Sequence, residues 1–186
     1  MLLPLTAWAL TGAVFYLKPG YVDAYETLQV KSYSLEPRIA LPTDQAWLEV
    51  RVLKTILGEH LLARTAQGWQ HLDPSSLLPK PHPSNDDIRA LIADAILSNP
   101  GRYGRIVSVE GNDITTDTGV HISLDWNKLS LFQRGKDTDR IDLLYKIHYL
   151  QWTGIKPLDK VLGMLGILLV LALSALGARL LFSRGS

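Results

Sequence analysis

The sequence predicts an extracytoplasmic α+β domain, built from antiparallel strands and helices, between two transmembrane α-helices. Three observations support this fold class. Two uncharged apolar runs lie near the ends of the chain, short strand patterns separated by turns fill the middle, and two helical patterns interrupt the strands. We therefore divide the chain into a first transmembrane helix (1–18), a periplasmic α+β domain (19–155), a second transmembrane helix (156–183) and a cytoplasmic tail (184–186).

The two apolar runs cover residues 2–17 and 161–178, and neither contains a charge. An α-helix rises ~1.5 Å per residue, so about 20 residues cross a hydrocarbon core of ~30 Å. The second run continues past Arg179 and fits this length. The first is short and needs a thinner bilayer or a packing partner. A cleaved signal peptide is the alternative for the first run, but a basic leading region and a small-x-small cleavage site are both missing.

Basic residues near the ends of the apolar runs predict the orientation. Arg179 and Arg184 flank the second run, whereas Lys156 and Lys160 on its other side weaken the asymmetry. We expect a two-pass protein of the bacterial inner (cytoplasmic) membrane, with both termini cytoplasmic and the bulk of the chain periplasmic.

Charge and cysteine content exclude several functions. The segment between the apolar runs holds 17 of the 19 lysines and arginines and all 18 acidic residues, so it presents no basic surface for nucleic acid. The chain has no cysteine, which excludes disulfides, thiolate metal sites and cysteine nucleophiles.

The central segment is predicted to begin with strands. Residues 24–35 are rich in strand formers, and residues 47–57 alternate between apolar and polar side chains. Turns at Gly58-Glu59 and Gln67-Gly68 make residues 47–72 a meander.

A helix and a second group of strands follow a proline-rich connection at residues 73–84. Ser84 and Asp87 have the spacing of a capping box at the start of the helix. Short strands are then expected at 105–109, 114–116, 120–126 and 129–134. A last helix, at residues 139–152, has two apolar sides and therefore needs two surfaces to cover it.

The order of these elements resembles the PepSY-associated transmembrane proteins. The resemblance covers nearly the whole chain and rests on Thr11-Gly12 in the first run, on Leu124-Asp125-Trp126-Asn127-Lys128, and on Ile147-His148-Tyr149 before the closing run. It implies an α+β PepSY module between membrane helices. The sequence departs from the pattern where the glycine after His148 is delayed to Gly154. Some larger relatives are haem-carrying reductases with four spans, but neither apolar run here contains a histidine, so reductase activity is not implied.

The histidines and acidic pairs predict no catalytic or metal site. The five histidines are not spaced as metal ligands along one helix or strand, and His60, His82 and His121 are expected to face water. Asp86-Asp87 fits helix capping. We expect no enzyme activity and no cofactor. His148, on an apolar helical face, is expected to bond a backbone carbonyl, and a haem or metal ligand is the alternative.

The predicted functional residues are therefore those that dock a partner. They lie on the last helix and on the small-residue face of the second apolar run: Leu144, Ile147, His148, Trp152, Ser174 and Ala178. We expect a non-catalytic accessory, assembly or regulatory subunit whose partners are the bilayer and other integral membrane subunits of a respiratory or haem/metal redox complex. The alternatives are a periplasmic binding or protease-inhibitory module and a haem-binding electron carrier that uses His148.

Overall fold

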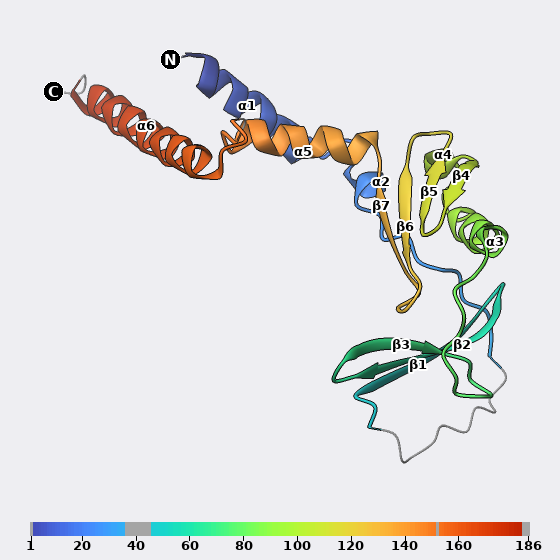
Figure 1. Ribbon diagram of the computed structural model, residues 1–186. Helices are drawn as coiled ribbons and strands as arrows, with labels where there is room; N and C mark the ends of the chain where they lie inside the picture. The colour runs from blue at the N-terminus through green and yellow to red at the C-terminus, as the bar shows by residue number, and fades with distance from the viewer. Residues whose placement is uncertain (1, 36–45, 152, 184–186) are drawn as a thin grey trace. The chain divides into compact units, whose positions relative to one another are not determined.

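The computed structural model shows an α+β protein with two antiparallel sheets, and it describes residues 2–35, 46–151 and 153–183 (Figure 1). The chain forms two compact units. One contains residues 1–21 and 137–186, and the other contains residues 22–136. Each unit is described by itself.

The unit of residues 22–136 contains a three-stranded meander in the order β1-β2-β3. Its strands are β1 (Glu49–Thr55), β2 (Gly58–Thr65) and β3 (Gly68–Leu72). The predicted meander is confirmed, with tight turns at Gly58 and Gly68, where both glycines have positive φ. Four consecutive β2 residues, His60, Leu61, Leu62 and Ala63, are buried, so this strand is covered on both faces.

The second sheet of this unit has the order β4-β5-β6-β7. The strands are β4 (Ile106–Glu110), β5 (Asp113–Thr116), β6 (His121–Asp125) and β7 (Ser130–Arg134), as expected within a few residues. Helix α3 (Asn85–Ile96) packs against β4, and the short α4 (Pro100–Tyr103) follows it. The apolar residues of α3 meet the inward face of β5 and β6 in the main core, which contains Ile88, Leu91, Ile92, Ile114, Ile122 and Leu124.

The predicted capping box begins α3. The Ser84 hydroxyl accepts from the Asp87 backbone N–H, and the Asp87 carboxylate accepts from the Ser84 backbone N–H. Both donors would otherwise lack a helical partner.

Residues 24–35 do not form the expected strand. The short helix α2 (Tyr21–Ala24) starts this segment, which then runs extended with two isolated bridges, Gln29 to Ser130 and Tyr33 to Lys54. Strand-forming side chains predict an extended backbone, but they do not by themselves supply a neighbouring strand with a continuous register.

The unit of residues 1–21 and 137–186 is helical. It contains α1 (Leu2–Leu17), most of α5 (Lys136–His148) and α6 (Lys156–Ser183). Among the described residues, one helix is long and apolar enough to cross a membrane, over Lys156–Gly177, and a shorter apolar stretch covers Trp8–Leu17. The last helix before α6 ends at His148 and not at residue 152, because Leu150 has a left-handed φ of +55°.

Candidate functional site

His148 lies where α1 and α5 meet. Its Nδ1 is 2.9 Å from the Thr11 hydroxyl oxygen, and its backbone carbonyl accepts a hydrogen bond from the Trp8 indole N–H. The Thr11 hydroxyl also donates to the Trp8 carbonyl at 3.2 Å. Since that proton is used, Nδ1–H of His148 is the donor to Thr11, and the lone pair of the neutral imidazole lies on Nε2.

This geometry differs from the expected bond to a backbone carbonyl, because the partner of the imidazole is a hydroxyl. The ring also packs against Phe15, with centroids 5.0 Å apart, and against Trp8 at 6.1 Å. The arrangement holds α1 against α5. An Nε2 lone pair fixed in this way is a competent metal donor, but among the described residues no group of three His, Asp or Glu side chains could hold an ion.

The other predicted docking residues divide between α5 and α6. Leu144 and Ile147 on α5 are half-buried, and Ser174 on α6 is exposed, its hydroxyl donating to the Val170 carbonyl at 2.9 Å. Trp152 lies outside the described residues, and so does the side chain of Ala178.

The small-residue face of α6 is occupied at its start. A Cβ added to Gly163 would lie 3.5 Å from the Tyr149 carbonyl oxygen, and one added to Gly166 would lie 2.7 Å from Leu150. Nothing lies within 4 Å of the same position at Gly177. This face therefore packs against other residues near the start of α6. Further along the helix, at Ser174 and Gly177, no described residue covers it.

A buried histidine pair lies in the other unit, between the two sheets. His60 and His71 are 0% and 4% exposed, and His60 Nδ1 is 2.8 Å from His71 Nε2. His60 Nε2 is 2.8 Å from the Thr55 hydroxyl, and His71 Nδ1 is 2.8 Å from the Trp126 carbonyl. The pair thus joins β1 through Thr55 to the β6–β7 turn through Trp126.

The tautomers of the two histidines follow from the groups at the two ends of this series of hydrogen bonds. The Trp126 carbonyl only accepts, so His71 Nδ1 carries a proton and His71 Nε2 accepts from His60 Nδ1–H. The Thr55 oxygen accepts from the Leu57 N–H at 3.0 Å and donates to His60 Nε2. Every polar atom of the two rings is satisfied when both histidines are neutral.

Burial keeps both imidazoles neutral. Burial, with smaller effects of the Lys80 charge and of His71, lowers the pKa of His60 to about 3. Burial also lowers the pKa of His71 to about 4, although the hydrogen bond to the Trp126 carbonyl favours its protonation. The expectation that His60 faces water is wrong, whereas His82 and His121 are exposed as predicted.

A cavity of about 620 Å³ lies beside Trp126, whose carbonyl accepts the hydrogen bond from His71. The β1–β2 turn, the proline-rich connection, the start of α3 and Trp126 line it. Two of its polar groups are Lys80, whose pKa is lowered by burial, and Asp73, whose pKa is lowered by hydrogen bonds from Ser75 and Ser76. The buried Trp126 indole N–H has no hydrogen-bond partner among the described residues.

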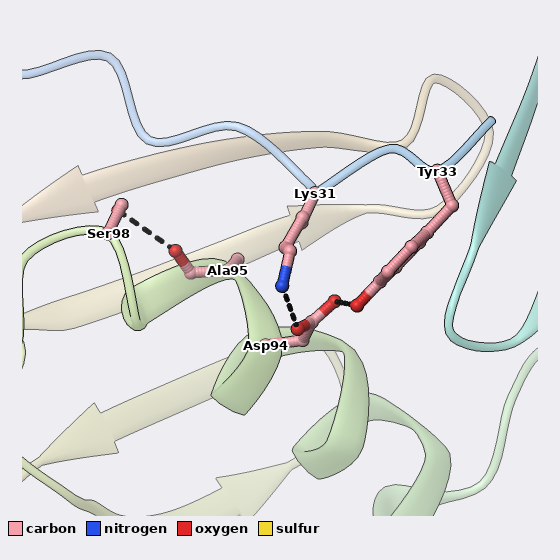
Figure 2. Close-up of polar contacts among 5 residues, drawn as sticks. All are labelled: Lys31, Tyr33, Asp94, Ala95 and Ser98. Atoms are coloured by element: carbon pink, nitrogen blue, oxygen red, sulfur yellow. Dashed lines mark hydrogen bonds and ion pairs between the residues drawn. The ribbon is translucent and has the colours of Figure 1, made fainter.

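A third cluster fixes the extended segment to α3 (Figure 2). Asp94 accepts from Lys31 at 3.0 Å and from the Tyr33 hydroxyl at 2.7 Å. Burial alone would raise the pKa of Asp94, but these two bonds outweigh it and leave the pKa below its usual value. The side chain of Lys31 is half exposed, so the ion pair itself contributes little stability.

Sequence reasoning missed both the histidine pair and the Asp94 cluster. The pair was detectable, because the turn at Gln67-Gly68 places Leu62 opposite His71 on the neighbouring strand. His60 lies two residues before Leu62 on the same face, so the two histidines are diagonal neighbours. Spacing along a single strand could not show this. Asp94 had no comparable signal, because its partners lie about 60 residues away in a segment that is outside the named strands.

No family model, no curated protein and no solved structure matches this chain.

Proposed function

We propose that this protein is a non-catalytic accessory, assembly or regulatory subunit that α6 anchors in the inner membrane. The observation that carries the proposal is α6 itself. It offers a 22-residue span, Lys156–Gly177, whose charged residues all lie in its first five positions, and none of its most apolar 18-residue window is buried inside the structure. A helix with exposed large apolar side chains around most of its circumference needs lipid or another helix to cover it.

The small-residue face of α6 supports a protein partner in addition to lipid. Near the start of α6 this face packs closely against Leu150 and Trp8, and it continues to Ser174 and Gly177 with nothing on it among the described residues. Small side chains let helix backbones approach closely within a membrane. A transmembrane helix of another subunit fits this continuation.

The class of the partner complex comes from the resemblance and not from the contacts. A periplasmic α+β module that precedes a His-containing helix and an apolar span resembles proteins of haem and ferric-iron redox chemistry. A respiratory or other haem- or metal-dependent redox complex of the inner membrane is therefore the proposed partner, and residues 19–155 are the proposed periplasmic part.

The proposal is tested by placing a bulky side chain on each side of α6. Residues nine apart on a helix lie on opposite sides, so Leu165→Phe is the matched control for Ser174→Phe. Both positions are exposed. Ser174→Phe should release co-purifying membrane subunits from the full-length protein in mild detergent, whereas Leu165→Phe should retain them. Equal retention of partners in both variants would contradict a helix partner on this face.

A second candidate function, a periplasmic binding or protease-inhibitory module, is favoured by the cavity of about 620 Å³ beside Trp126. This volume lies within the range of ligand pockets. A soluble protein that co-purifies in place of membrane subunits, and dissociates on Lys80→Gln, would support it. A haem Soret band in the same sample, lost on His148→Gln, would instead support the electron-carrier alternative.

A further inference from the structure

We propose that the carboxyl-terminal half of α1 lies at the membrane surface, where it forms with α5 a platform that rests on the lipid headgroup layer. The proposal rests on the proposed anchoring by α6, and the headgroups belong to the bilayer that α6 crosses. It replaces the full crossing that the sequence predicts for residues 1–18.

Helices α1 and α5 lie side by side in opposite directions. The Trp8 ring lies beside His148, and the Phe15 ring stacks on Tyr145 with centroids 4.5 Å apart. Further along, a Cβ added to Gly20 would lie 3.4 Å from the Arg140 guanidinium. Residues of α1 from Trp8 onwards therefore share the depth of α5 in any bilayer.

The charged residues of α5 show that this depth lies outside the hydrocarbon core. Asp139, Arg140, Asp142 and Lys146 are all exposed or half-exposed. A charged side chain at the membrane centre is strongly unfavourable, and such residues are rare there. Arg and Lys can extend to the headgroups, but the short Asp side chains cannot. Since α5 stays outside the core, the part of α1 that packs on it stays outside as well.

Helix α6 gives the depth of the platform. Its Gly163 lies at the Tyr149 carbonyl, and its Gly166 lies at Leu150 and Trp8. From Gly163 to Ser183 the helix rises about 30 Å, the thickness of the hydrocarbon core. The hydrocarbon boundary therefore falls near Gly163, at the level of Tyr149 and within about one helical turn of Trp8, and Trp and Tyr side chains are favoured at this boundary.

The platform also has exposed apolar side chains that suit the headgroup layer. They are found on both helices and include Leu10, Tyr16 and Leu17 of α1 and Leu143 of α5, with Tyr149 just after α5. When the platform lies among headgroups, these apolar side chains are removed from water. The charged side chains of the platform stay outside the hydrocarbon core at the same time.

The experiment uses the full-length protein in lipid nanodiscs with one spin label at a time. The chain contains no cysteine, so single-cysteine variants need no background substitutions. Labels at Tyr16→Cys and Leu143→Cys report the platform, Leu168→Cys reports α6 and His121→Cys reports the domain. All four positions are exposed. Collision with oxygen, which concentrates in hydrocarbon, and with a water-soluble nickel chelate gives the depth of each label.

We expect Leu168 to favour oxygen, His121 to favour the nickel chelate, and Tyr16 and Leu143 to give matching intermediate values. A Tyr16 label as deep as Leu168 would overturn the proposal, because α1 would then cross the core. Labels at Tyr16 and Leu143 as open to nickel as His121 would also overturn it. A Leu168 label in water would overturn the anchoring by α6, and the platform with it.

Discussion

At the scale of single residues, the buried imidazoles of His60 and His71 make stability depend on pH. Both pKa values are lower in the folded protein, at about 3 and about 4, than the usual 6.5. Below pH 6.5 the unfolded chain binds protons that the folded chain does not bind. The free energy of unfolding therefore falls as the pH falls from about 6.5 towards 4, and it is fully retained above that window.

Acidification from pH 7 to pH 5 should lower the free energy of unfolding by roughly 2–4 kcal/mol if both histidines remain neutral in the fold. The measurement is denaturant unfolding at the two pH values. The exposed His121→Gln variant should keep this difference, and His60→Gln should reduce it. A difference that is the same in both variants would show that other groups cause it.

The hydrogen bonds of Asp94 give a second prediction at this scale. Tyr33→Phe removes the 2.7 Å bond to a buried carboxylate and should cost about 1–2 kcal/mol of stability. Lys31→Gln should cost less than Tyr33→Phe, because the side chain of Lys31 is half exposed and water screens its charge. Thermal unfolding of the two variants gives the order, and a larger loss for Lys31→Gln would contradict this account of the cluster.

At the scale of elements, two neighbouring acidic residues at the start of α3 have different roles. Asp87 closes the capping box, whereas Asp86 is exposed in the first turn. Asp87→Ala should cost more stability than Asp86→Ala, because it removes the hydrogen bond from the Ser84 backbone N–H as well as a charge that the helix dipole favours. Equal losses in thermal unfolding would mean that the capping box contributes nothing beyond charge.

The packing of α6 gives another prediction for an element. Gly166→Leu should separate the start of α6 from Leu150 and Trp8, because even a Cβ would approach Leu150 to 2.7 Å. Gly177→Leu is the matched control, with nothing within 4 Å of its Cβ. Hydrogen exchange of the amides at 145–150 should increase in the first variant only. Unchanged exchange in both would show that this contact does not order the end of α5.

Elements with their own local signals were predictable from the sequence. The β1-β2-β3 meander followed from parity and from its glycine turns, and α3 followed from its capping box and apolar spacing. Residues 25–35 were not predictable in the same way, because isolated bridges depend on partners such as Lys54 and Ser130 that are distant in the sequence. The end of α5 at His148 depends on the left-handed backbone of Leu150, which its side chain does not indicate.

The candidate sites were predictable only where the signal lay within one helix. Apolar and small-residue spacing indicated α6 and its packing face. The partner of His148 could not be predicted, because Thr11 lies 137 residues away and on another helix. The buried histidine pair required the cross-strand register of β2 and β3, which combines two elements.

At the scale of the whole molecule, we propose that lipid and another subunit cover α6 of the helical unit. This differs from a soluble protein, in which a helix of this composition would be buried in a core. The central claim is therefore that the chain exists in the membrane as part of a larger assembly.

The most direct test is native electrophoresis of the full-length tagged protein, extracted from alkali-washed membranes in mild detergent, with mass spectrometry of the band. We predict that the 20.7 kDa chain stays with the washed membranes and migrates with integral membrane polypeptides in a fixed ratio. Release of the chain by the alkaline wash, or its migration alone after extraction, would contradict the account.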